Sequence, residues 1–568
     1  MKDRLRSWPA AVPGVRALST YERAWLSKDI VAGLVLTALL VPQGMAYAEL
    51  AGLPPITGLY TSVLALFGYW LMGPSKVLVL GPDSALGPMI AATILPLMGA
   101  DQDPAKAIAL ASMLALMVGT IMLLAGLAKL GFIADLLSMP TQIGYMNGLA
   151  LTIIVGQLPK MFGFSVDADG FIPELRGFVD GLVAGETVGA ALAVGIGALV
   201  VILVLQLAMP KVPAVLVAVV LSIFAVQVFN LEASGVSVVG PLPSGFPPFT
   251  IPRVSLSDLP LLLGGALGIV FVALADTIST ASAFASRAGG RVHGNREMVG
   301  IGTSNIAAGL FQGFPVSTSG SRTAVAEQAG AKTQLTGLVG AVAIIVILVA
   351  APGLLRNLPQ PALAAIVIAA SLSLANIGAV ARLWKQRKTE AWLAIVAFLA
   401  VTFFGVLTGI GIAVALSILA VFRRTWWPYQ AILGDTPGFP GFHDLVGHPD
   451  GRTVPGLVIF RFDAPLIFAN ARTLREQVHE LAEDPGVRWI LIASEPITDV
   501  DTTAADMLED LDEWLNARGI SLVFAEMKDP VRTKITRYGL TRTIDPRHFY
   551  PTIRAAVSAY EALAAADT

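Results

Sequence analysis

Two stretches of sequence decide the fold: Leu80-Gly81-Pro82-Asp83-Ser84-Ala85 and Phe314-Pro315-Val316-Ser317-Thr318-Ser319-Gly320-Ser321-Arg322. Each interrupts apolar sequence and runs into a helical pattern, so each predicts a helix that begins inside a membrane. The first N–H groups of a helix have no partner within it, and at bilayer depth only protein or a water-filled cavity can supply one. With the positive end of the helix dipole, they form an anion site. Interrupted segments in matching places of two halves are typical of a secondary transporter's substrate site.

Composition indicates a polytopic membrane protein. The 568 residues are 55% hydrophobic and 14% charged, with a mean hydropathy of +0.72. The absence of cysteine excludes disulfide, iron–sulfur and thiol chemistry, and the five histidines match no metal-ligand spacing. Apolar runs near the length of a bilayer predict about 14 helices. The expected spans are 29–48, 56–73, 82–97, 107–128, 131–156, 187–208, 212–230, 259–286, 297–313, 320–329, 335–353, 361–378, 390–408 and 409–423.

Charge divides the chain into two parts. From Ile432 onward there are 13 Lys/Arg and 21 Asp/Glu, which gives the tail a formal charge of −8 and leaves +6 for the preceding part. Arginines beside Trp426 and Trp427 suit a helix that leaves the bilayer at headgroup level. The expected organisation is a cytoplasmic N-terminal segment (1–28), a transport domain (29–424), a linker (425–453) and a small α/β domain (454–562). Its expected strands are 457–462, 489–493 and 522–524, and its expected helices are 471–481 and 503–517.

Loop charges predict the orientation. Lysines and arginines such as Lys76, Lys129 and Lys385 fall in alternate loops, whereas the intervening loops carry Asp103 and Asp167. This pattern places both termini in the cytoplasm. The first residues lack the apolar region of a cleavable signal peptide, so we expect the first helix to direct membrane insertion. Seven helices followed by seven more would give halves of opposite orientation, which is an inverted repeat.

The anion site should be formed by the broken helices and the first helix. Pro42 and Gly44 should loosen that helix and let Gln43 and Tyr47 line a cavity. Tyr47 has core packing as its alternative role. Gly81 is expected to cap the first broken helix and Pro82 to lie in its first turn, next to Asp83 and Ser84. In the second broken helix, hydroxyls and a flexible glycine surround a charge that is costly in a membrane: Thr318, Ser319, Gly320, Ser321 and Arg322.

Two carboxylates at membrane depth indicate cation coupling. Asp276 lies within the apolar stretch 261–285 and shares one helical face with Thr280, which suggests a coupling-ion site. The alternative role for Asp276 is a structural salt bridge to Arg322. Asp83 would repel an anion if it were ionised in the site, so it is either proton-linked or only a helix N-cap.

Several further motifs occur in a fixed order along the chain. Val41-Pro42-Gln43-Gly44-Met45-Ala46-Tyr47 precedes Ala51-Gly52-Leu53-Pro54-Pro55. Gly81-Pro82, Asn295-Arg296-Glu297 with Asn305, and Pro315 through Arg322 follow, and the tail contains Asp499-Val500-Asp501-Thr502-Thr503. In this order the motifs resemble those of the SulP/SLC26 anion transporters. The tail motif is similar to the loop-to-helix turn of a STAS domain.

The resemblance implies a 7+7 inverted repeat with core and gate domains, elevator movement and a homodimer. It implies an anion between the third and tenth helix starts, near Gln43, Tyr47, Asp83, Ser319 and Ser321. Family members that couple bicarbonate uptake to Na⁺ have an Asp and a Thr that match Asp276 and Thr280. Those members also hold Na⁺ with backbone groups and a Thr in the tenth-helix region. This chain departs from their pattern there, because it has Thr318, Ser319 and Gly320. Asp83 replaces an apolar residue of several relatives, which favours H⁺. Thr502 matches a phosphorylated Ser of STAS relatives, with a plain helix N-cap as its alternative role.

We therefore expect a secondary active transporter of a small anion in the cytoplasmic (inner) membrane, coupled to H⁺ or Na⁺. Sulfate is the first expectation for the substrate, followed by bicarbonate and C4-dicarboxylates. An uncoupled anion channel and a transport-like sensor are the alternative classes. The chain has neither a nucleophile–base pair nor a Walker motif, so we expect no enzyme and no ATP use. The expected partners are membrane lipid, a second copy of the chain and a cytoplasmic protein that binds the STAS domain, with no nucleic acid and no cofactor.

Overall fold

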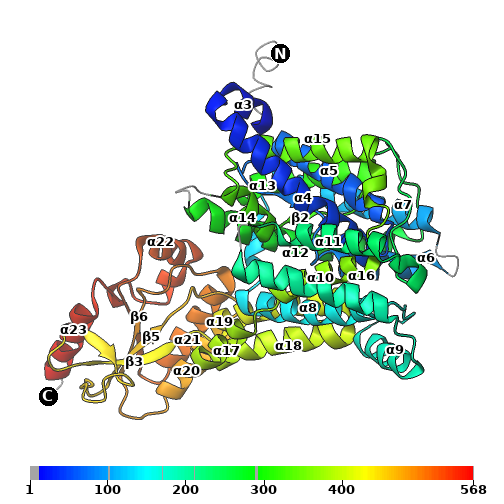
Figure 1. The fold of residues 1–568 in the computed structure, drawn as a ribbon. Helices are drawn as coiled ribbons and strands as arrows, with labels where there is room; N and C mark the ends of the chain where they lie inside the picture. The colour runs from blue at the N-terminus through cyan, green and yellow to red at the C-terminus, as the bar shows by residue number, and fades with distance from the viewer. Residues whose placement is uncertain (1–11, 100–102, 169, 210–211, 288–291, 567–568) are drawn as a thin grey trace. The chain divides into compact units, whose positions relative to one another are not determined.

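The structure is a computed structural model that describes residues 12–99, 103–168, 170–209, 212–287 and 292–566 (Figure 1). Residues 1–11 of the expected N-terminal segment lie outside the described residues. The chain forms two compact units, one ending at Ser417 and one beginning at Ile418. Among the described residues, seven helices are long and apolar enough to cross a membrane, and shorter apolar helices accompany them.

Each of the fourteen expected spans contains a helix, because runs of apolar residues without Gly-Pro breaks favour continuous helix at bilayer depth. Helices α3 (Pro13–Ser19), α9 (Phe171–Ala184) and α17 (Ile377–Gln386) are additional. The fourteen helices are α4 (Leu26–Leu50), α5 (Pro55–Met72), α6 (Gly87–Met98), α7 (Pro104–Leu127), α8 (Met139–Phe162), α10 (Gly189–Ala208), α11 (Ala214–Val228), α12 (Leu259–Arg287), α13 (Gly294–Leu310), α14 (Gly320–Gln328), α15 (Leu335–Ala350), α16 (Gln360–Leu374), α18 (Lys388–Phe404) and α19 (Val406–Trp426).

The helices of the first unit pack in two groups, and each group takes helices from both halves of the sequence. The first helix group consists of α4–α7 with α12–α15, in which α13 packs on α5 and α7, and α15 packs on α4 and α5. The second helix group contains α8, α10, α11, α16 and α18, which run alongside one another (Figure 1). The second group meets the first where α11 and α16 contact α4. This interleaving is the arrangement that an inverted repeat with core and gate domains requires.

Glycines set the spacing inside the first helix group. A Cβ atom on Gly58 of α5 would lie 1.9 Å from the carbonyl oxygen of Gly44 on α4. A Cβ atom on Gly302 of α13 would lie 2.8 Å from the carbonyl oxygen of Gly119 on α7. Only glycine permits these backbone approaches, which is how helices pack closely in a membrane without a hydrophobic driving force between them. The close packing of α4 on α5 and of α7 on α13 therefore follows from the positions of these glycines.

The first broken helix starts later than expected. Leu80–Gly81 forms a short strand, β1, and α6 begins only at Gly87, so the expected cap at Gly81 and first turn at Pro82 are wrong. The Asp83 Oδ1 atom accepts the N–H of Ala85 at 2.8 Å, which folds residues 83–86 into a turn. Pro88 then occupies the first turn of α6, where its missing N–H costs nothing.

Helix α8 also starts later than expected, at Met139 instead of residue 131. Residues Gly131–Leu136 form a separate 3₁₀ turn. The Ser138 hydroxyl accepts the N–H of Thr141 at 3.5 Å and caps α8, and a proline lies in its first turn. A capping serine followed by proline is a strong helix start, so the local sequence explains the boundary.

The second unit is an α/β domain built on a six-stranded mixed sheet with the order β4-β3-β5-β6-β7-β8. The strands from β5 to β8 are parallel, and β3 is antiparallel to both of its neighbours. Separate apolar clusters cover the two faces of the sheet. The elements are β3 (Gln430–Asp435), β4 (Phe442–Asp444), β5 (Leu457–Phe462), α20 (Ala471–Leu481), β6 (Trp489–Ala493), α21 (Thr502–Asn516), β7 (Ser521–Ala525), α22 (Asp529–Tyr538), β8 (Phe549–Tyr550) and α23 (Ile553–Ala566).

The three expected strands and two expected helices of this domain are present, with ends that shift by at most one residue. The sheet also recruits β3 and β4 from residues 425–453, where the sequence predicted a linker. Strand β4 has only three residues, all half-buried, and β3 has an irregular burial pattern, so neither shows the regular hydrophobic alternation that marks a strand.

Candidate functional site

The two broken helices are joined through their leading strands. Strand β1 pairs antiparallel with β2 (Ser317–Thr318), with Leu80 opposite Thr318 and Gly81 opposite Ser317. The N–H of Ser319 donates to the carbonyl oxygen of Val79 at 3.1 Å, and the N–H of Val79 donates to the Thr323 hydroxyl at 3.1 Å. This pairing satisfies extended backbone at membrane depth and brings the starts of α6 and α14 together.

We call the place where β1 pairs with β2 and the starts of α6 and α14 meet the crossing. Arg322 lies at this crossing. It is the third residue of α14 and is 1% exposed. None of its three guanidinium nitrogens has a hydrogen-bond partner among the described residues. A Cβ atom on Gly81 would lie 3.0 Å from its Nη1 atom, so β1 needs glycine there to admit the guanidinium. A buried cation without a partner is costly, and an anion would supply the missing acceptors.

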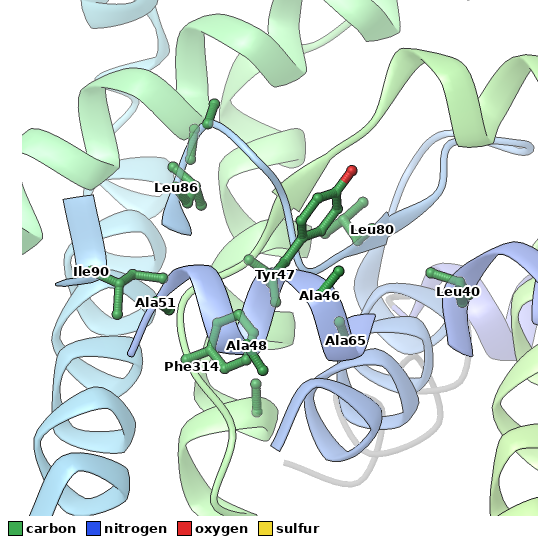
Figure 2. Close-up of a cluster of buried hydrophobic side chains, with 14 of the residues drawn as sticks. Leu40, Ala46, Tyr47, Ala48, Ala51, Ala65, Leu80, Leu86, Ile90 and Phe314 are labelled. Atoms are coloured by element: carbon green, nitrogen blue, oxygen red, sulfur yellow. The ribbon is translucent and has the colours of Figure 1, made fainter. Parts of the chain in front are cut away.

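Three other ionisable side chains share the electrostatic environment of Arg322: Asp83, Tyr47 and Asp276. Tyr47 is 5% exposed. Figure 2 shows its ring beside Leu80, with the hydroxyl directed away from the α4 ribbon. Its apolar edge therefore packs in the core, as the alternative role predicted, while its hydroxyl remains near the charged cluster.

The remaining predicted anion residues lie along the same helix starts. Ser84 is buried beside Asp83 in the turn before α6, and Gln43 is half-buried one helical turn before Tyr47. The Ser319 hydroxyl caps α14, accepting the N–H of Arg322 at 3.5 Å, and lies 3.1 Å from the Ser321 hydroxyl. Ser321 itself is exposed, and Gly320 is half-buried. The structure thus places these residues around the two crossover segments and the adjoining turn of α4.

The predicted coupling-ion residues meet where α12 passes α14. The Thr318 hydroxyl donates to the Thr277 hydroxyl at 3.2 Å, which ties β2 to α12 beside Asp276. A Cβ atom on Gly320 would lie 3.8 Å from the Thr280 hydroxyl oxygen. Asp276, Thr277, Thr280 and Thr318 therefore lie in one place, and their role as a coupling-ion site stays a prediction. The expected alternative of a hydrogen-bonded salt bridge between Asp276 and Arg322 is absent from the described residues.

Sequence reasoning missed Tyr145, which approaches the cluster from the second helix group. Tyr145 lies on α8, is fully buried, and has a hydroxyl without a hydrogen-bond partner among the described residues. Asp276, Asp83 and Gln142 are the polar side chains in its surroundings. A tyrosine in an apolar helix gives no signal of its own, because it is common in cores, so only the packing of α8 reveals it.

Two motif residues that sequence analysis left without a role support the crossing. The Asn305 side chain on α13 accepts the N–H of Val316 at 2.9 Å and donates to the carbonyl oxygen of Val316 at 3.2 Å, which fixes the approach to β2. Glu297 accepts from the Tyr69 hydroxyl at 2.7 Å and from the Ser75 hydroxyl at 2.5 Å, which fixes the approach to β1. Helix α13 thus braces both strands.

The alternative role of Thr502 was that of a helix N-cap, and this expectation is wrong because Thr502 does not cap α21. Asp501 occupies that position, with Oδ1 accepting the N–H of Ala504 at 2.8 Å and Oδ2 accepting the N–H of Phe468 at 2.7 Å. A carboxylate is at least as good a cap as a threonine hydroxyl, so the preceding residue takes the role. Thr502 is the first helical residue and is exposed.

Comparisons with known proteins agree over almost the whole chain. The model of the sulfate permease family matches residues 26–397, and that of the STAS domain matches residues 448–556. A probable sulfate transporter of Mycobacterium tuberculosis is 41% identical over 550 residues, covering 96% of this chain and 98% of that protein. The chloroplastic sulfate transporter 4.1 of Arabidopsis thaliana is 29% identical over 577 residues, covering 98% of this chain and 83% of that protein.

Solved structures show the same fold. The murine solute carrier 26 family member A9 anion transporter, in its inward-facing state, has a TM-score of 0.89 at 22% identity and covers 97% of this chain and 94% of that chain. The transmembrane domain of a cyanobacterial bicarbonate transporter has a TM-score of 0.58 at 21% identity and covers 70% of this chain and 98% of that chain.

Proposed function

The chain belongs to the sulfate permease (SulP/SLC26) family, and from this premise we propose that it is a secondary active sulfate transporter with the anion bound beside Arg322. The observation that carries the proposal is the buried guanidinium of Arg322, whose nitrogens have no partner among the described residues. The sulfate transporters among its relatives, at up to 41% identity over nearly full length, favour sulfate over the other anions.

The site has the donors that sulfate requires. The guanidinium supplies a planar set of N–H donors that matches an oxyanion, and the start of α14 adds the positive end of its dipole. The Tyr145 hydroxyl is a second buried donor that has no hydrogen-bond partner in the described part of the chain. An anion with several acceptor oxygens that contacted both groups would satisfy both of them.

Electrostatics favours transport coupled to a cation. Arg322 carries one positive charge, whereas Asp83 and Asp276 carry two negative charges if both are ionised. A doubly charged anion would enter this cluster only if a proton or Na⁺ neutralised at least part of the negative charge. Asp276 with Thr280 and Thr318 is the proposed cation position, and Asp83 is the proposed proton acceptor.

The proposed movement is an elevator displacement of the first helix group against the second. The anion residues and the cation residues all belong to the first group, so they would move together with the substrate. Tyr145 belongs to the second group and would contact the anion in only part of the cycle. We place the protein in the cytoplasmic membrane with both termini in the cytoplasm, in keeping with its loop charges.

Uptake of radiolabelled sulfate, bicarbonate and succinate into proteoliposomes tests the proposal, with a pH gradient, a Na⁺ gradient, or neither. Accumulation of sulfate that depends on a cation gradient is the expected result. Asp276→Asn should abolish accumulation while the protein still folds, because the coupling charge is lost. Asp180→Asn, at an exposed position on α9, is the matched control. Rapid sulfate flux that only equilibrates, indifferent to both gradients, would contradict coupling and favour a channel.

A further inference from the structure

Another buried carboxylate, Asp29, lies outside the proposed anion and cation sites. It is in the first turn of α4 and is fully buried. Its Oδ1 atom accepts from the N–H of Lys332 at 2.7 Å, the N–H of Thr333 at 3.2 Å and the Thr336 hydroxyl at 3.1 Å. Its Oδ2 atom accepts from the Thr333 hydroxyl at 2.7 Å and the Tyr21 hydroxyl at 3.1 Å. Five donors therefore converge on one carboxylate.

Four of these donors belong to the loop that follows α14 and to the first turn of α15. This loop also reaches the approach to β1, because the Gln334 side-chain amide donates to the carbonyl oxygens of Ser75 and Leu78, both at 2.8 Å. The contact continues along α4, where a Cβ atom on Gly33 would lie 2.8 Å from the carbonyl oxygen of Thr336. The loop is thus the junction between α4, α14 and the strand that carries Gly81.

We propose that Asp29 is a positioning residue for the anion site. Its carboxylate acts as an acceptor only and holds the α14–α15 loop against α4. Arg322 on α14 and Tyr47 on α4 depend on this junction for their relative placement, since their helices approach the site from different parts of the chain. This inference rests on the proposed function, because it assigns Asp29 a part in the same sulfate site.

The alternative role for a buried carboxylate in a transporter is cation coupling, and the hydrogen-bond geometry distinguishes the two. In Asp29→Asn the remaining oxygen can keep the three donors of Oδ1. The new amide can donate to the hydroxyls of Tyr21 and Thr333, which are able to accept. Asn therefore preserves the junction but removes the charge. In Asp29→Ala the N–H groups of Lys332 and Thr333 lose their acceptor in a buried place.

The cysteine-free chain offers a direct measure of the junction. Ala331 lies in the loop and is 6% exposed, so Ala331→Cys should react slowly with a maleimide. Adding Asp29→Ala should raise the reaction rate by at least about tenfold, whereas Asp29→Asn should stay within about threefold. In parallel, the KM for sulfate should rise in Asp29→Ala and remain near the parent value in Asp29→Asn. Asp180→Ala is the matched surface control.

Two outcomes would overturn the proposal. An unchanged maleimide rate in Asp29→Ala would show that the carboxylate does not hold the loop. Loss of sulfate accumulation in Asp29→Asn with an unchanged maleimide rate would identify a coupling residue. If Asp29→Ala does not fold, Thr333→Val, which removes one donor, should give an intermediate maleimide rate. The maleimide measurement requires no substrate, so a failure of sulfate transport in the parent would be recognised separately.

Discussion

The interaction between sulfate and Arg322 can be tested by removing the guanidinium while keeping the volume of the side chain. Arg322→Met retains a long apolar side chain without charge or donors. A hydrogen bond that involves a charged group contributes about 1.5–3 kcal/mol. Because about 1.4 kcal/mol corresponds to a factor of ten in affinity, sulfate binding should weaken by about 10- to 150-fold. Arg322→Lys should recover part of this loss, since it restores the charge but not the planar pair of donors.

The same variant should change stability in an informative direction. In the empty protein the guanidinium is buried without a hydrogen-bond partner among the described residues, so its removal takes away a cost and not a contact. Sulfate at a hundred times its Kd should stabilise the parent by about 2.7 kcal/mol. With a 10- to 150-fold weaker affinity, the Arg322→Met variant should lose between about half and about nine-tenths of this stabilisation at the same sulfate concentration.

Thermal unfolding in detergent across a sulfate titration measures both effects. Arg296→Met, at an exposed arginine in the first turn of α13, is the matched control and should keep the full sulfate shift. The reasoning would be refuted if Arg322→Met lowered the unfolding temperature equally with and without sulfate. That result would mean that Arg322 contributes to structure instead of holding the anion.

Two further changes test individual side chains. Tyr145→Phe should weaken sulfate binding by about three- to tenfold without lowering the unfolding temperature, because the hydroxyl makes no hydrogen bond with the described residues that the change would remove; unchanged affinity in equilibrium binding would remove Tyr145 from the site. In the STAS domain, burial raises the pKa of Asp512 to about 6 from its ordinary 3.8. The protonated side chain therefore contributes stability that is fully present below about pH 3.8. This stability is lost as the pH rises through about 6. Asp512→Asn should therefore raise the unfolding temperature of this domain at pH 8 and have little effect near pH 4, whereas Asp510→Asn at an exposed position should have little effect at either pH. An equal gain at both values would contradict the assignment.

Some features were predictable because they depend on local sequence. Each expected span contains a helix, and α20 begins and ends where its periodicity predicts. The start of α6 was misplaced because Gly81 and Pro82 have the properties of a helix start, yet they lie in and beside a strand. The competing partner of that strand, β2, is more than 230 residues away in the sequence. Local propensity could not reveal that competition.

The sequence by itself determined which segments enter the membrane, where two of them break, and that an arginine follows the second break. These properties depend on hydropathy, on glycine and proline, and on the cost of a charge in an apolar medium, all of which are local. Only the tertiary structure decided that β1 pairs with β2, that Asp29 meets Thr333 from 304 residues away, and that the Arg322 guanidinium has no hydrogen-bond partner among the described residues. Such contacts depend on how the helices pack in three dimensions, because the donors and acceptors that complete a buried polar group come from distant parts of the chain.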